Sequence, residues 1–259
     1  EKNEFYLWSW TNCWTSIYHP WEYLEGNCLK KNILGVTLAR GGSKGIKNKN
    51  LTKINGKPLI YFTIIEAKKC KKISNYIVST DSNKIKKVAE KYKAEVPFTR
   101  PRKFSKDNST SASALKHALI ECEKFFNKKF DYVVELMATN PLKSVKDING
   151  IINILLKNNA DSVIAVNQLF DHHPARIKKI VKGKIFDFAI KEKLESRRQD
   201  LKPDAYVRSG SIYAMSRRFV MNEKRYFSSK SFAYILPLKR TINIDDENDL
   251  LIAKKKLQK

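Results

Sequence analysis

Several patterns that identify common protein classes are missing from this chain of 259 residues. Its four cysteines form no C-x-x-C pair and no disulfide framework, which fits a reduced, cytoplasmic compartment. No run of 18 or more apolar residues occurs, so no membrane-spanning helix is predicted. The P-loop pattern G-x-x-x-x-G-K-[ST] and the dinucleotide pattern G-x-G-x-x-G are also absent, which disfavours both of those nucleotide-binding folds.

Negative charge is scarce, with 26 Asp and Glu residues against 51 Lys and Arg and a formal net charge of +25. Such a balance attracts nucleic acids, anionic membranes or anionic small substrates. Lysines scatter over the predicted helices, which favours a solvated surface that attracts anions in general. A nucleic-acid binder stays an alternative, but it would need surface aromatics or a recognition module, and the sequence shows neither.

The first 32 residues differ in composition from the rest of the chain. All four tryptophans lie there, without helical or strand periodicity. The segment lacks the basic start, apolar centre and small-residue cleavage site of a signal peptide. We therefore expect residues 1–32 to be an extension outside a catalytic fold that spans residues 33–259.

Strands and helices alternate along most of the remaining chain, which predicts an α/β fold with a doubly wound, mostly parallel sheet. A change of pattern at residues 167–204, which include a hairpin-like stretch, predicts an insertion outside that sheet. Buried strands are predicted from Ile33 onward and at 76–80, 95–99, 132–137, 162–166, 210–215 and 233–238. Helices are predicted at 57–69, after Asp81 as a cap, at 109–126 and 145–156, and from Asp245 to about 257.

A glycine-rich, basic loop follows the first strand, in the stretch ILGVTLARGGSKGIKNKNL at residues 33–51. Glycines let backbone amides approach a ligand, and the strand delivers the loop to the sheet edge where α/β proteins bind ligands. The cations suit a triphosphate, although a plain turn after a strand has a similar pattern. The candidate nucleotide-binding residues of this loop are Arg40, Gly41, Gly42, Ser43, Lys44, Lys49 and Asn50.

The run LAR-x-x-SKG-x-x-x-KNL resembles the signature of the acylneuraminate (CMP-sialic acid type) cytidylyltransferases, and the similarity continues in register to Lys259. It implies a GT-A-like, Rossmann-type nucleotidyltransferase sheet whose inserted arm, at about 167–204, forms a homodimer and completes the partner's sugar site. The implied reaction transfers CMP from CTP to the anomeric hydroxyl of a nine-carbon 2-keto sugar acid of the sialic, legionaminic or pseudaminic type, and releases pyrophosphate. Such CMP-sugars serve surface glycan biosynthesis.

Two other enzyme classes are weighed against this resemblance. A ketodeoxyoctonate cytidylyltransferase is the nearer alternative, but the pattern K-N-x-K-N-L favours the sialate-type branch. A glycosyltransferase of similar architecture would need a D-x-D motif after a central strand, and the sequence has none there.

A second polar group lies at Thr99-Arg100-Pro101 and at residues 107–111. Hydroxyls and free amides at 107–111 are typical of a helix N-terminus, and plain capping would explain them. The resembled family lines its cytosine and ribose pocket with R-P-x-x-[LF]-x-x-D-x-[AS]-[ST]-S. That match implies nucleotide contacts from Arg100, Ser109 and Ser111.

The end of the strand at 132–137 carries the motif ELMATNPLK. The family commonly has L-Q-x-T-S-P-L-R here, so this chain keeps T-x-P-L but has Met137, Asn140 and Lys143 at the three changed positions. A methionine cannot make the hydrogen bonds of glutamine. The resemblance places Met137, Thr139 and Asn140 in the sugar site. The departures at Met137, Lys143, Ser209 and Asn243 favour a legionaminic-type acid, and N-acetylneuraminic and pseudaminic acids stay open as alternatives.

Arginines in two later motifs suit the carboxylate of such a sugar, because their planar fork binds carboxylates in a bidentate manner. A solvent-exposed surface pair is the alternative. The family often has F-R-P-N-G where this chain has Y-V-R-S-G, so the arginine is displaced by one position. The candidate sugar-binding residues here are Arg198, Gln199, Arg208 and Ser209.

Asn243 and Asp245 lie two residues apart before the last predicted helix, so on an extended segment their side chains point the same way. Such oxygens can hold Mg²⁺ that bridges phosphates. The family has D-I-D here, and an amide replaces the first carboxylate in this chain. Asp81 is a second acidic candidate. The expected catalytic residues are Arg40, Lys49 and Asp245.

Overall fold

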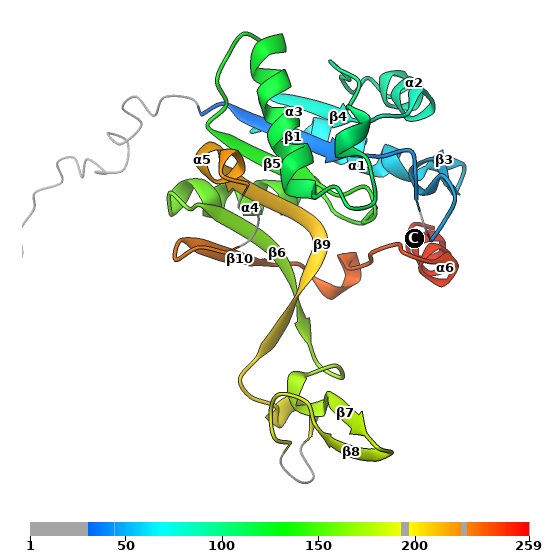
Figure 1. Cartoon of the computed structure of the whole chain (residues 1–259), viewed down its shortest axis with the longest axis vertical. Coiled ribbons are helices and arrows are strands. Elements are labelled where there is room, and N and C mark those ends of the chain that lie inside the picture. The colour runs from blue at the N-terminus through cyan, green and yellow to red at the C-terminus, as the bar shows by residue number, and fades with distance from the viewer. Residues whose placement is uncertain (1–30, 44, 193–196, 224–226, 259) are drawn as a thin grey trace, which may run out of the picture. The chain divides into compact units, whose positions relative to one another are not determined.

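The computed structural model describes residues 31–43, 45–192, 197–223 and 227–258, and its centre is a six-stranded sheet (Figure 1). The strand order is β10-β6-β9-β5-β1-β4, in which β9 runs antiparallel to both neighbours and the other pairs are parallel. The strands are β1 (Ile33–Leu38), β4 (Asn75–Ser79), β5 (Tyr132–Leu136), β6 (Ser162–Leu169), β9 (Ala205–Ser216) and β10 (Ser231–Ile235). The prediction of a mostly parallel α/β sheet is confirmed.

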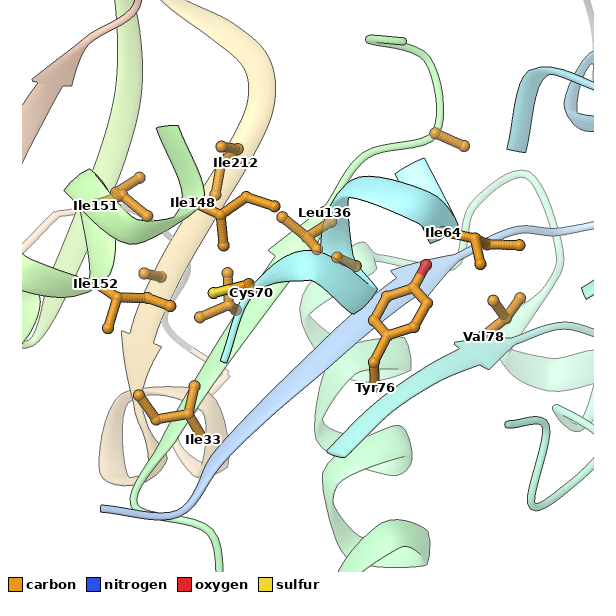
Figure 2. Packing of buried hydrophobic residues seen from close by; sticks show 14 of the residues in the cluster. Ile33, Ile64, Cys70, Tyr76, Val78, Leu136, Ile148, Ile151, Ile152 and Ile212 are labelled. Carbon is orange, nitrogen blue, oxygen red and sulfur yellow. The ribbon is translucent and has the colours of Figure 1, made fainter. Parts of the chain in front are cut away.

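Helices cover both faces of the sheet, as a doubly wound fold requires. One face packs against α1 (Leu59–Lys69), α2 (Asn83–Lys91) and α4 (Val145–Lys157), and the other against α3 (Ser111–Phe125) and α5 (Arg217–Met221). Figure 2 shows Ile148, Ile151 and Ile152 of α4 among the residues of the first face. Each fully buried isoleucine of this kind contributes about 1.5–3 kcal/mol.

A third, smaller core joins the C-terminal segment to the region that follows β1. The short strands β2 (Lys53–Ile54) and β3 (Lys57–Pro58) form a hairpin beside α6 (Glu247–Lys256). Its buried residues come from both ends of the chain: Ile54, Leu59, Ile242, Ile244 and Ala253. This packing fixes the segment that carries Asp245 next to the glycine-rich loop.

Residues 170–204, here called the arm, lie between β6 and β9 and carry the hairpin of β7 (Lys178–Val181) and β8 (Lys184–Asp187) (Figure 1). The outer halves of β6 and β9 pair as a ribbon that leads to the arm. The pairing shifts register beyond Ile164, opposite Gly210, whose φ of +61° is a left-handed conformation that favours glycine. This bulge bends β9 out of the sheet.

Three local predictions are wrong. Residues 95–99 form no strand, because only Glu95 and Thr99 make isolated bridges to β4 and its end. Ser82, and not Asp81, is the N-cap of α2. The final helix begins at Glu247, two residues later than expected, since Asp246 caps it by accepting the backbone N–H of Asp249.

The other predicted elements occur within a few residues of their expected places, and β9 is longer at its start because it continues into the ribbon. Within the described ranges, every helix is too short or too polar to cross a bilayer. Cys70 and Cys122 are buried free thiols. The prediction for residues 1–32 falls, except for its last two residues, outside the described ranges.

Candidate active site

Two adjoining pockets open where β1 and β5 end. The helix pocket, about 300 Å³, reaches the N-terminus of α3, and the loop pocket, about 400 Å³, reaches the glycine-rich loop and the C-terminal segment. Leu38, Arg40 and Met137 line both pockets, so the two form one continuous site. The carboxyl edge of parallel strands is where α/β proteins bind ligands.

A larger hollow of about 810 Å³ lies at the opposite edge of the sheet. Its two arginines already have carboxylate partners within the chain, because Arg217 pairs with Glu123 and Arg218 pairs with Asp161, each at 2.7 Å. A surface of satisfied ion pairs offers little to an incoming anion. The carboxyl edge is therefore the candidate active site.

The loop after β1 is held in shape by side chains from other elements. Gly41 N–H donates to Asp81 Oδ1 at 2.8 Å, and Asn50 Nδ2 donates to the carbonyl of Arg40 at 3.2 Å. Arg40 forms an ion pair with Asp107 at 2.8 Å across the helix pocket. The sequence suggested a cap or a metal ligand at Asp81, but its carboxylate supports the loop instead.

Lys49 and Asp245 meet in the loop pocket although 196 positions separate them in the chain. Lys49 Nζ donates to Asp245 Oδ1 at 2.9 Å and to the carbonyl of Ile244 at 2.8 Å. The loop approaches so closely at Gly45 that a Cβ there would collide with the carbonyl oxygen of Asp245. A glycine is thus required for this contact between the loop and the C-terminal segment.

Asn243 and Asp245 form the expected pair, and the Nδ2 of Asn243 donates to Asp245 Oδ2. The described residues include no group of three or more His, Cys, Asp or Glu side chains that could enclose a metal ion. One carboxylate and one amide oxygen still fit Mg²⁺, which binds through one or two carboxylates and takes its other ligands from phosphates and water. The donor set therefore fits a cation that substrate phosphates share.

Arg100 forms the wall of the helix pocket and is only 4% exposed. Its Nε donates to Ser105 Oγ at 3.1 Å, and its Nη2 lies 3.9 Å from Asp81 Oδ1 and has no hydrogen-bond partner. Burial lowers the pKa of Arg100, although an arginine stays charged at physiological pH. A buried donor without an acceptor is a group that a ligand oxygen can satisfy.

Ser109 and Ser111 also line the helix pocket. The hydroxyl of Ser109 is engaged within its own loop, where it donates to the carbonyl of Lys103 at 2.7 Å and accepts from Lys106 N–H at 3.1 Å. Thr110 caps α3. Ser111 begins the helix and keeps its side chain at the pocket wall.

Met137 and Thr139 line the loop pocket, and Thr139 Oγ1 is buried there without a partner. Asn140 lies outside both pockets: it is buried, accepts from Leu142 N–H at 3.1 Å and donates to the carbonyl of Arg240 at 3.4 Å. The structure therefore places Met137 and Thr139 at the pocket, whereas Asn140 holds the loop to the C-terminal segment.

A buried ion pair that the sequence gave no sign of anchors that segment. Asp147 of α4 is 0% exposed, and Arg240 donates to both of its carboxylate oxygens at 2.7 Å. Ser144 and Tyr234 also donate to this carboxylate. Burial acts to raise the pKa of Asp147, but these hydrogen bonds together lower it below its ordinary value.

The remaining candidate residues line neither the helix pocket nor the loop pocket, or fall outside the described residues. Arg198 and Gln199 line a separate pocket of about 270 Å³ within the arm. Arg208 is exposed on β9, and the buried hydroxyl of Ser209 has no partner. Gly41 and Gly42 line neither the helix pocket nor the loop pocket, and Lys44 falls outside the described residues.

Comparison with known proteins identifies the family of the chain. A family model described as "Cytidylyltransferase" matches residues 34–221. "Post-translational flagellin modification protein B" of Campylobacter coli is 32% identical, over 87% of this chain and 97% of that protein. "CMP-N,N'-diacetyllegionaminic acid synthase" of Campylobacter jejuni is 31% identical, over 85% and 92%. Further relatives at about 30% identity are named as pseudaminic acid and N-acylneuraminate cytidylyltransferases.

The fold also matches solved structures. A structure of CMP:2-keto-3-deoxy-manno-octonic acid synthetase complexed with CTP superposes with a TM-score of 0.64 over 88% of this chain and 99% of the other. At 15% sequence identity this likeness shows the shared fold alone. The family match and the relatives above 30% identity carry the assignment that the motifs predict: the chain belongs to the cytidylyltransferase family.

Proposed function

We propose that the protein transfers CMP from CTP to the anomeric hydroxyl of a nine-carbon 2-keto sugar acid and releases pyrophosphate. The observation that carries this proposal is the continuous site at the carboxyl edge, where Arg40 and Met137 join one pocket to the other. Two joined pockets suit a reaction with two substrates. The relatives named for legionaminic, pseudaminic and N-acylneuraminic acid support the substrate class.

In this proposal the nucleoside of CTP occupies the helix pocket. Arg100 offers its unpartnered Nη2 to an acceptor oxygen there, and Ser111 lies at the same wall. The triphosphate extends past Arg40 into the loop pocket, toward Lys49. Arg40 then exchanges its ion pair with Asp107 for phosphate oxygens, which carry more charge and accept bidentate hydrogen bonds.

The acceptor sugar enters the loop pocket between Met137, Thr139 and Asp245. Its anomeric oxygen attacks the α-phosphorus in line with the departing pyrophosphate, whose negative charge grows in the transition state. Lys49 and Arg40 are fixed cations beside that charge, and preorganised cations of this kind lower the barrier. The apolar Met137 favours a sugar face without a hydrogen-bonding requirement at that point.

Asp245 and Asn243 are the residues that would hold Mg²⁺, which supplies charge neutralisation of the phosphates when bound. Asp245 has the one carboxylate among the described residues that line the loop pocket. Lys49 and Asn243 orient this carboxylate by hydrogen bonds to its two oxygens. The carboxylate of Asp245 is therefore already positioned beside the glycine-rich loop before any ligand binds.

We also propose that the protein is a homodimer in which the arm of one chain serves the site of the other. Arg198 and Gln199 do not line the pocket of Asp245 in their own chain. The β7–β8 hairpin carries lysines but also exposes apolar side chains, with Ile180 and Ile185 at 76% and 70%. A lone two-stranded hairpin is marginally stable in water, so a covering partner explains this composition.

The reaction is tested by measuring pyrophosphate release with Mg²⁺ and each nucleoside triphosphate against a panel of acids. The panel contains legionaminic, pseudaminic, N-acetylneuraminic and ketodeoxyoctonic acids. Release with CTP and one nine-carbon acid, and not with ATP, GTP or UTP, is the expected result. Release with the eight-carbon acid alone would move the protein to the ketodeoxyoctonate class, and no release from folded protein that binds CTP would refute the proposal.

A further inference from the structure

A buried cation lies beneath the loop pocket without lining it. Lys143 is 2% exposed, and its Nζ donates to Thr63 Oγ1 at 2.8 Å, to the carbonyl of Met137 at 2.7 Å and to the carbonyl of Asn140. An ammonium group has three donors, and all three are used here. Burial of a cation costs several kcal/mol unless such bonds offset it, so the position calls for an explanation.

The bonds of Lys143 span the residues that form the pocket wall. Met137, at one end of the loop, and Asn140, at the other, are held by the same ammonium, and Thr139 lies between them. The carbonyl of Thr139 accepts the N–H of Ile244 at 2.9 Å, directly before Asp245. The ammonium of Lys143 therefore fixes the shape of the loop from Met137 to Asn140. Through Thr139 it also fixes the position of the C-terminal segment that carries Asp245.

Two carboxylates face Lys143 from the neighbouring helices, Glu66 of α1 and Asp147 of α4, and both act to raise its pKa. Each carboxylate already has other donors. Glu66 accepts from Val145 N–H at 2.7 Å and pairs with Lys69, and Asp147 is bound by Arg240, Tyr234 and Ser144. Burial is the largest influence, and it lowers the pKa of Lys143 to about 7.

We propose that Lys143 is the positioning residue of the acceptor-sugar pocket: it holds the carbonyls of Met137 and Asn140 so that Thr139 faces the substrate. This inference rests on the proposed function of the loop pocket. Loss of the Lys143 proton leaves two donors for three acceptors, so the loop loosens as the pH rises through about 7. The affinity for the sugar then falls with rising pH, whereas the affinity for CTP, whose nucleoside is held in the helix pocket, changes much less.

The test compares Lys143→Met and Lys143→Arg with wild type, and the exposed neighbour Lys146→Met is the control. In wild type we expect KM for the sugar to rise between pH 6 and 8.5. Lys143→Met removes all three hydrogen bonds of the ammonium, so it should raise that KM by about tenfold or more at pH 6, tenfold being the usual loss for one charged hydrogen bond, and remove its pH dependence, whereas the Kd for CTP stays within about twofold. Lys143→Arg, always charged, should restore much of the affinity with a flat profile.

A second measurement keeps the inference testable without turnover. Amide hydrogen exchange at Ile244 reports the bond to Thr139, and in CTP-bound protein it should become faster in Lys143→Met and, in wild type, faster above pH 7 than the intrinsic pH effect predicts. If Lys143→Met does not fold, Thr63→Val removes one of the three acceptors and should raise KM for the sugar about threefold.

The outcomes separate this inference from the proposed reaction. If wild type releases no pyrophosphate with any acid, the proposed function fails, and the exchange at Ile244 still decides the role of Lys143. If Lys143→Met leaves both the sugar KM and this exchange as in wild type, the positioning role is overturned. Equal losses in CTP affinity and sugar affinity, with a lower melting temperature, would show general destabilisation and also overturn it.

Discussion

The carboxyl edge of the sheet and the arm use their side chains in opposite ways. At the sheet edge, polar groups are bound to partners distant in the chain, as Lys49 is to Asp245 and Asp147 is to Arg240. In the arm, the hairpin presents Ile180 and Ile185, a directly paired couple, to solvent. In the first region these charged groups find their partners within one chain, whereas the second region has an apolar surface that its own chain leaves uncovered.

This difference separates two requirements of the proposed reaction. Charge stabilisation at phosphorus needs groups fixed before the substrate binds, and a network anchored in the core provides that. Sugar recognition by a second subunit needs only a surface that docks. Substitutions at the sheet edge should therefore change turnover or folding in each chain, and substitutions in the arm should change assembly and the affinity for the sugar.

The largest effect is expected at Lys49. Lys49→Ala removes the cation that faces both Asp245 and the proposed triphosphate, so kcat should fall by about 10²–10³, the usual loss for one preorganised group that stabilises transition-state charge. Steady-state kinetics with saturating CTP measure it. Lys47→Ala, an exposed lysine of the same loop, is the control and should keep normal turnover. Near-normal kcat in Lys49→Ala would remove Lys49 from the site.

The buried pair of Asp147 and Arg240 should dominate stability at this edge. Asp147→Ala leaves Arg240 without its bidentate partner, and we expect the free energy of unfolding in urea to fall by about 3 kcal/mol. The double variant that also carries Arg240→Ala should lose less than the sum of the two single variants. Strict additivity would show that the two side chains do not stabilise each other.

The same pair gives stability a definite dependence on pH. The pKa of Asp147 in the folded protein is lowered, so the stabilisation is fully present above the ordinary pKa of an aspartate. It is lost as the pH falls through the lowered value, because the unfolded state binds the proton more tightly. The difference in the free energy of unfolding between wild type and Asp147→Ala should therefore stay constant from pH 6 to about 4 and narrow as the pH falls further.

Local sequence patterns were sufficient for the strands that end at the site. The short apolar runs gave β1 and β5 nearly to the residue, and parallel pairing of these strands brings Arg40 and Met137 to one edge. The assignment of Lys49 and Asp245 to one site, although they lie far apart in the chain, came from motifs of the resembled family. Periodicity alone does not show which loops meet at an edge.

The unpredicted features are side-chain partners far apart in the chain. Asp81 has the sequence position of a helix cap, yet its carboxylate binds Gly41 on the neighbouring strand end, because β1 and β4 are adjacent and parallel. In the sequence, Lys143 is a departure from the family motif at the implied sugar site, yet its side chain points into the core. Both outcomes depend on tertiary packing, which offers a polar group partners that local sequence does not reveal.

The apolar face of the arm should govern assembly. Ile185→Asp places a charge at the centre of the exposed hairpin face, and we expect the dissociation constant of the dimer to rise about 30-fold, the loss of one interface hot spot of about 2 kcal/mol. Sedimentation velocity over a concentration series measures it. Leu251→Asp, the same change at an exposed position of α6, should leave the dimer intact. A monomeric wild type would exclude the assembly itself.

The smallest expected effect distinguishes action within one chain from action between chains. Arg198 lies over the ring of Phe170 at 4.3 Å in the arm, and Arg198→Ala should raise KM for the sugar about tenfold, as expected for one charge-assisted hydrogen bond. Arg197→Ala, its exposed neighbour, is the control. When Arg198→Ala chains are mixed with inactive Asp245→Ala chains, a heterodimer has one site with an intact Asp245 and an intact Arg198 of the partner subunit. That site should show the wild-type KM, since both defects then fall together in the other site. If mixing restores nothing although heterodimers form, Arg198 acts within its own chain, and the two regions are not divided between subunits.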